Sequence, residues 1–525
     1  MGGSISLPSL PESFQFFVIT FRLPDNLKVL HADEATLAKI KDTIDLVYSP
    51  GILREKPPAN KRPSTDASSS PTAGERTFVL NGQPFHDDKH GHFSPTAETQ
   101  LVEIQVRRLF CELLRELAKI GWRLALSSDI SRAVDLSSWF FQRVKDAALE
   151  KPLNPGRVIC ISLMSHDSLR IVNAPRALFP TFRKVLHTGY GYGLHGSKGQ
   201  GGEKVLANGL AYEVILGGWP WRTTNLEESV FARRLMLNIF RQLRNMGYQF
   251  CGTTSGDCLF FEQVEESQVN DESPPIVESS GGPTENSSTP STPSTPTPGA
   301  DFLLISLNAP DILRLVEAPT EAIDAVREAL KETIGQKKLQ KENDLTTRYS
   351  AFEFQLYGSP WNCVGGESVS VRHMIAAIFR RLRCIGWQLH ATLDLSRRHN
   401  DKACFVFQKT EESRELLHMI LAPADTDKLK LINPGDGAVQ EVEKLLKEHW
   451  PYGIYKESTV EPRPLPSSSS DHMLVVMAIR WIRVEVEMML KMGSFPVLWT
   501  WAGAPLQRSS VQQQMVCFFP FIRAT

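Results

Sequence analysis

Apolar and polar residues alternate in the same way after four aspartates of the chain. In each case the aspartate is followed by apolar residues that flank a basic one, and the segments are Asp25–Leu30, Asp167–Val172, Asp311–Val316 and Asp427–Ile432. This alternation predicts a half-buried strand that leaves a tight turn, where an aspartate side chain bonds its own backbone. The repeat of this segment predicts four copies of one unit.

Two helices are predicted in each copy from apolar residues at helical spacing. The shorter helix is expected at 35–47, 176–186, 320–333 and 437–449, and a glycine follows it at Gly51, Gly193, Gly335 and Gly453. The longer helix ends at Ile120, Met246, Ile385 and Met492, again before a glycine, and in the fourth copy the apolar segment 472–490 is expected to form it. Glycine at these places suits a left-handed residue after a helix.

A third recurring feature is the motif Leu-x-Gly-x-Pro-aromatic, at 80–85, 216–221 and 356–361. Proline cannot continue a strand ladder, so the motif predicts the end of a strand and a folded-back ring. The fourth copy has the Pro/Ser-rich segment 461–470 in this place. It is therefore predicted to be one strand short.

The predicted fold class is α+β, with four tandem diverged ββαβαββ units arranged as two pairs, sheets largely antiparallel and helices on one face. The units are placed at 13–150, 157–264, 301–410 and 415–521, the last being degenerate. Residues 265–300 between units two and three are rich in Ser, Thr and Pro, a composition that cannot supply a core. They are predicted to form a disordered linker.

Composition narrows the classes of partner. The chain has 525 residues, with 58 basic and 59 acidic side chains, so no strong field would attract nucleic acid. No segment is long and apolar enough to span a membrane. The eight cysteines are scattered without a Cys-x-x-Cys pair, which is typical of reduced thiols in a cytoplasmic protein.

Three segments resemble known functional motifs. The N-terminus, Met1–Ser6, fits the myristoylation pattern with Gly2 as the acceptor, which would give weak membrane contact. The segment His86–His92 gathers three histidines, yet a solvated loop explains it better than a zinc site. In the segment Gly189–Gly202, Gly202 occupies the position of the lysine of a phosphate-binding loop, so a long loop explains the segment better. No metal or cofactor is predicted.

Two residue sets are candidates for a ligand or partner surface. The first is Trp219, Trp221 and Trp361 of the proline motif, and the second is the arginines of the long helices, including Arg233 and Arg372. A basic residue that recurs at the same position of the helix in each copy either pairs with a structural acceptor or faces a partner. If these arginines lined a groove, they would select a carboxylate or phosphate ligand.

The repetition favours a non-enzymatic protein-interaction scaffold, because no nucleophile with a visible base occurs in any copy. One alternative is a ligand-binding protein or enzyme with a cleft between paired units. A second is a peripheral membrane protein anchored through a myristoylated Gly2.

Overall fold

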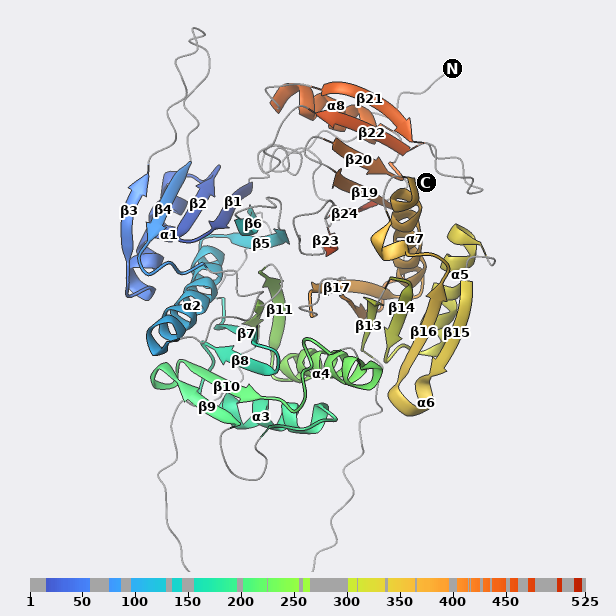
Figure 1. The fold of residues 1–525 in the computed structure, drawn as a ribbon. Coiled ribbons are helices and arrows are strands. Elements are labelled where there is room, and N and C mark those ends of the chain that lie inside the picture. The colour runs from blue at the N-terminus through green and yellow to red at the C-terminus, as the bar shows by residue number, and fades with distance from the viewer. Residues whose placement is uncertain are drawn as a thin grey trace, which may run out of the picture.

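The chain folds into four similar units that follow one another around a ring (Figure 1). The structure is a computed structural model, and it describes residues 16–56, 75–85, 96–128, 135–143, 155–195, 202–223, 225–254, 258–264, 301–308, 310–335, 339–363, 366–395, 404–413, 415, 417–424, 428–434, 437–449, 454–460, 471–476, 498–502 and 514–521.

Units one and two each contain a six-stranded antiparallel sheet and two helices. Unit one consists of β1 (Phe16–Arg22), β2 (Asn26–Leu30), α1 (Glu34–Val47), β3 (Ile52–Lys56), β4 (Arg76–Leu80), α2 (Ala97–Lys119), β5 (Trp122–Ser128) and β6 (Asp135–Arg143). Unit two consists of β7 (Val158–Met164), β8 (Ser168–Val172), α3 (Leu178–Gly189), β9 (Glu203–Leu206), β10 (Ala211–Ile215), α4 (Leu226–Asn245), β11 (Tyr248–Thr253) and β12 (Cys258–Gln263).

Units three and four repeat the order of the strands, with a short additional helix in unit three, while residues 477–497 of unit four lie outside the described residues. Unit three consists of β13 (Phe302–Asn308), β14 (Ile312–Val316), α5 (Thr320–Ile334), β15 (Leu339–Leu345), the short α6 (Thr346–Tyr349), β16 (Ala351–Leu356), α7 (Gly366–Cys384), β17 (Trp387–Leu393) and β18 (Cys404–Lys409). Unit four consists of β19 (Leu417–Ala424), β20 (Lys428–Ile432), α8 (Ala438–His449), β21 (Ile454–Val460), β22 (Asp471–Val476), β23 (Leu498–Ala502) and β24 (Gln514–Phe521).

The strand order is the same in all four sheets. In unit one it is β3-β4-β2-β1-β6-β5, and the equivalent strands of the other units follow this order. The predicted α+β fold class and the four tandem units are confirmed. Each unit contains one strand more than the predicted ββαβαββ, because an additional edge strand (β3, β9, β15 or β21) precedes the strand that pairs with β2 or its equivalent.

Two predictions for unit four are wrong. Its sheet has six strands like the others, so the unit is not one strand short. The apolar residues 472–476, expected to begin a helix, lie in β22 between β20 and β21. A short continuous apolar run suits a buried strand as well as a buried helix, and periodicity alone does not separate the two.

The hairpin turn between the first two strands of a unit binds the proline motif. In units one to three, the leucine of the motif donates its backbone N–H to the aspartate carbonyl, in the pairs Leu80–Asp25, Leu216–Asp167 and Leu356–Asp311. The aromatic residue donates its N–H to the residue before that aspartate, in the pairs Phe85–Pro24, Trp221–His166 and Trp361–Pro310. The three aspartates therefore occupy equivalent turns, while Asp427 lies outside the described residues.

Each of the three long helices that the structure describes packs between two sheets. Helix α2 covers its own sheet and also contacts β7 and β8 of unit two, and its core includes Val158, Cys160 and Phe260 of that unit. Helix α4 contacts β13 and β14 of unit three in the same way, and α7 contacts β19 and β20 of unit four. The units of each predicted pair do pack together, and α4 joins the two pairs through the same kind of interface.

One edge of each sheet is formed by the first strand of the last hairpin, and these edge strands are β5, β11, β17 and β23. The four strands meet at the centre of the ring (Figure 1). Strand β5 contacts β11 and β23, and β17 contacts β11 and β23. The described contact between β5 and β23 brings units one and four together. The ring is thus closed by neighbouring sheet edges.

Candidate functional site

The predicted site residues lie in different environments. Trp221 and Trp361 are buried in the cores of units two and three, and their indole N–H groups donate to the carbonyls of Ser168 and Ile312, at 3.2 and 3.1 Å. They anchor the proline motif to the second strand of their own unit. The structure does not bring Trp219, Trp221, Trp361 and the two arginines together into one surface.

The helix arginines lie at the boundaries between units. Each donates Nη1 to the carbonyl four residues earlier in its helix: Arg107 to Glu103 at 3.2 Å, Arg233 to Ser229 at 2.9 Å and Arg372 to Ser368 at 2.8 Å. The repeated spacing thus marks one structural position, which faces the sheet of the next unit.

The side chain four residues before each arginine contacts a basic residue of the next unit. Glu103 Oε2 accepts from Arg170 Nη1 at 3.2 Å, Ser229 Oγ from Arg314 Nη1 at 2.9 Å, and Ser368 Oγ from Lys430 Nζ at 3.5 Å. These three basic residues are the ones that the alternating segments after Asp167, Asp311 and Asp427 place on the second strand of each unit. The sequence repeat therefore encodes the contact between neighbouring units as well as the strand.

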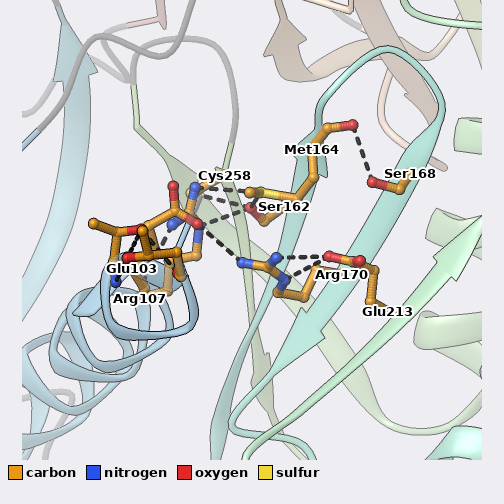
Figure 2. Close-up of polar contacts among 10 residues, drawn as sticks. Glu103, Arg107, Ser162, Met164, Ser168, Arg170, Glu213 and Cys258 are labelled. Carbon is orange, nitrogen blue, oxygen red and sulfur yellow. Dashed lines mark hydrogen bonds and ion pairs between the residues drawn. The ribbon is translucent and has the colours of Figure 1, made fainter. Parts of the chain in front are cut away.

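Figure 2 shows the first of these boundaries, where the charges balance. Arg170 binds Glu103 and Glu213, and its Nη2 lies 2.6 Å from Glu213 Oε2. Arg107 donates Nε to Ser162 Oγ at 2.7 Å and Nη2 to Met164 Sδ at 3.4 Å. Two guanidinium groups and two carboxylates thus lie at this boundary, where Arg170 and Glu213 are buried and Arg107 and Glu103 are half-buried, an arrangement that offsets the cost of removing charge from water.

The second boundary has one carboxylate fewer, because Ser229 replaces the glutamate. Arg314 Nε binds Glu353 Oε1 at 2.7 Å, and the Ser229 hydroxyl accepts from both Arg314 and Arg233. Arg233, Arg314 and Ser229 are all buried. At the third boundary, burial lowers the pKa of Arg372 to about 10, which shows how strongly this environment disfavours an added charge.

Trp219 is the member of the predicted set that lies in solvent, with 63% of its surface exposed. Its backbone N–H donates to Glu228 Oε1, and its ring centroid lies 5.9 Å from that of His166. Tyr192, which is 42% exposed, packs edge-on to Phe231 with centroids 5.9 Å apart. We call Tyr192, Trp219, His166 and the carboxylates of Glu227 and Glu228 the aromatic corner of unit two.

The backbone of the aromatic corner is tightly packed. Gly217 donates its N–H to Gly193 O at 2.8 Å, and a Cβ added at Gly217 would clash with the carbonyl of Tyr192. Gly218 has φ +75°, and a Cβ there would clash with Glu228. Burial and the charges of Glu227 and Glu228 raise the pKa of Tyr192. Trp219 is therefore presented by a fixed turn beside negative charge.

The cysteines of the described residues are free. Cys111 of α2, Cys160 of β7 and Cys258 of β12 are buried at the boundary between units one and two, where burial raises the pKa of the Cys111 and Cys160 thiols. Protonated, buried thiols are poor nucleophiles. Within the part of the chain that the structure describes, no three His, Cys, Asp or Glu side chains are placed to hold a metal ion.

A groove of about 860 Å³ lies near the end of α4 and is lined by polar side chains that include Arg244, Asp301, Glu321 and Lys409. None of the three tryptophans lines this groove. This groove is therefore not the predicted ligand surface of Trp219, Trp221 and Trp361.

Several predicted features lie outside the described residues. They are Gly2, the histidine segment 86–92, residues 196–201 of the glycine-rich segment and the linker 265–300. Myristoylation of Gly2 stays a prediction. Among the described helices, none combines the length and apolar character that crossing a membrane requires.

Comparison with known proteins agrees with the repeat. The model of one domain family matches the chain three times, at residues 15–142, 157–262 and 301–408, which correspond to units one, two and three. Searches of curated proteins and of solved structures returned no match. Unit four lies beyond the three matches but has the same strand order as the others. Because the matches extend over more than half of its length, the chain belongs to the family that this repeated domain defines.

Proposed function

We propose that this protein is a cytoplasmic, non-enzymatic scaffold that binds a basic segment of a partner protein at the aromatic corner of unit two. The observation that carries the proposal is the exposed Trp219, fixed by its backbone bond to Glu228. Large exposed aromatic residues held in place are typical of protein interaction sites. The free cysteines support a cytoplasmic location.

The chemistry of the corner favours a cationic partner. Glu227 and Glu228 lie beside Tyr192 and Trp219, so the aromatic faces are close to two carboxylates. A lysine or arginine side chain can stack on such a face while its charge is balanced by the acids. An acidic segment would meet repulsion at the same place.

The packing of the units supports a rigid platform. The ring of Phe231 packs against Tyr192, and it also packs edge-on to Tyr349 of unit three, with centroids 6.4 Å apart. The corner therefore rests on two units at once. A preformed surface binds with a smaller loss of conformational freedom than a mobile one.

The test is fluorescence anisotropy with a labelled peptide rich in lysine and arginine, titrated with the full chain. Trp219→Ala is expected to weaken binding about tenfold, the size of a cation–π contact at a partly desolvated site. Tyr357→Ala is the matched control, because Tyr357 is an exposed aromatic residue in the same motif of unit three. It should leave the affinity unchanged.

A glutamate-rich peptide of equal length measures charge selection and should not bind. Equal affinity of the wild type and Trp219→Ala for the basic peptide would remove the aromatic corner from the proposal. Turnover of common metabolites by the purified chain, without any peptide binding, would remove the scaffold itself.

A further inference from the structure

Beyond the proposed scaffold function, we infer that a small inorganic anion such as chloride binds in the buried cluster of Arg233, Ser229 and Arg314, between α4 and the sheet of unit three. The cluster occupies the same position as the charge-balanced one between units one and two. It differs in having lost a carboxylate.

The Arg233 side chain has two buried donor groups to which an anion would bind. It is only 3% exposed, and its Nε and Nη2 groups are buried without a hydrogen-bond partner in the described part of the chain. Arg233 also forms no ion pair with any described residue. Both nitrogens belong to the same edge of the guanidinium, the fork that binds anions side-on.

Arg107 shows which partners this edge of the guanidinium has at the first boundary. Arg107 donates its Nε and Nη2 to Ser162 and Met164. The equivalents of those acceptors in unit three are Ser306 and Asn308, and the Ser306 hydroxyl donates to Asn308 Oδ1 at 2.7 Å, as the Ser162 hydroxyl donates to Met164 Sδ at 3.1 Å. Neither Ser306 nor Asn308 accepts a hydrogen bond from Arg233 Nε or Nη2.

The Ser229 hydroxyl is a third donor. Its oxygen accepts from Arg233 Nη1 at 2.5 Å and from Arg314 Nη1 at 2.9 Å, so both lone pairs are used. Its proton is then left to donate to a further acceptor. The two guanidinium groups beside it are donors and the Glu353 carboxylate is bound by Arg314, so a negative ion would supply that acceptor.

The burial of the cluster limits the size of the anion. Arg233, Ser229 and Arg314 are each less than 9% exposed, and the helix and sheet that carry them pack directly on each other. A phosphorylated ligand could reach the cluster only if units two and three separated. A monoatomic anion fits these conditions best.

The experiment is thermal unfolding of the full chain at constant ionic strength, with sodium gluconate replaced stepwise by sodium chloride from 1 to about 150 mM. An anion that binds only the folded state raises the melting temperature, here by about 2 to 4 °C over this range. Arg233→Met should abolish the rise. Arg107→Met is the matched control and should keep it, because Arg107 belongs to the charge-balanced cluster.

A second variant keeps the inference testable if Arg233→Met fails to fold. Ser229→Glu restores the residue that unit one has at the same position, Glu103, and so supplies an internal carboxylate. It should melt at a higher temperature than the wild type in gluconate and should no longer respond to chloride. A wild type without any chloride response, or an equal response in Arg233→Met, would overturn the inference.

Discussion

Arg241 of unit two binds Glu317 of unit three, with Nη1 2.6 Å from Oε2. Arg234, two turns earlier on the same helix, binds the other oxygen of this carboxylate at 3.0 Å. Glu317 follows β14 and has φ +54°, and His31, Asn173 and Asn433 have positive φ at the equivalent place. Asn173 also contacts the preceding unit, since its Nδ2 donates to Glu112 Oε1 of α2 at 2.9 Å. The left-handed residue is therefore a recurrent contact between units.

Glu317→Ala should destabilise the protein by about 1 to 3 kcal/mol, because it leaves two partly buried arginines without their carboxylate. Urea unfolding followed by circular dichroism measures the change. The control is Glu328→Ala, which breaks only an exposed pair with Lys331 and should cost less than about 0.5 kcal/mol. Equal costs for the two variants would show that the Glu317 contact contributes little.

Substitution of Gly121, which follows the long helix α2, tests whether this position requires glycine. Its φ is +88° and no atom lies within 4 Å of an added Cβ, so a substitution there changes the backbone preference without a clash. Gly121→Val is expected to cost about 1 to 2 kcal/mol. Gly121→Asn should cost clearly less, since asparagine tolerates positive φ best among the other residues. Identical melting curves for both variants would contradict this account.

Trp221→Phe tests the hydrogen bond of the Trp221 indole separately from the packing of the ring. The change keeps an aromatic ring in the core but leaves the carbonyl of Ser168 without the indole donor. We expect a loss of about 1 to 3 kcal/mol, the cost of a buried unpaired acceptor together with a small cavity. Differential scanning calorimetry of the full chain measures it, and Trp219→Phe, at an exposed position, should change stability by about 0.5 kcal/mol or less.

The lowered pKa of His390 predicts how the free energy of unfolding depends on pH. Its ring packs against Phe240, Phe250 and Phe302, and burial, followed by the charge of Arg244, lowers its pKa to about 4. Because the unfolded state binds the proton first, stability contributed by neutral His390 is complete above the unfolded pKa and is lost as the pH falls from about 6.5 to 4. The loss at pH 5 is about 2 kcal/mol. His390→Gln should remove this part of the pH dependence in urea titrations at pH 7.5 and pH 5, and an unchanged difference would show that other groups cause it.

The predicted acylation of Gly2 is tested by mass spectrometry of the N-terminal peptide from eukaryotic cells. A mass increase of one myristoyl group is expected in the wild type and not in Gly2→Ala. An unmodified Gly2 in the wild type would end this prediction. A single acyl chain gives only weak, reversible membrane binding, so most of the protein should stay in the soluble fraction.

The sequence predicted those elements that leave a periodic pattern, and much less of the contacts between units. The four short helices and the ends of the first three long helices were placed to within a few residues, because their apolar faces repeat and a glycine follows them, whereas the helix predicted at 472–490 was wrong where residues 472–476 form β22. The edge strand β3 was missed, since Leu53-Arg54-Glu55-Lys56 carries charge on an exposed edge and lacks a strand pattern. The apolar run Val158–Met164, buried throughout, did carry a signal that both faces of the sheet are covered.

The arginine positions were found from the sequence, but their environment could not be. Arg233 meets Ser229 on its own helix and Arg314 across a unit boundary, and the register between α4 and β14 decides that contact. The tryptophans show the same limit: Trp219 and Trp221 are two residues apart, yet one lies in solvent and the other in the core. Gly218, which has positive φ, precedes Trp219, and Pro220 lies between the two rings.

The placement of each long helix between two sheets also affects what would happen if the polypeptide were severed. The described contacts between units two and three include those of α4 with β13 and β14 and those of β11 with β17, and residues of both units share one apolar core. Two fragments divided within residues 265–300 would each have large apolar faces that the other fragment covers in the intact chain. They are therefore expected to reassociate into the intact particle when co-expressed, as complementary halves.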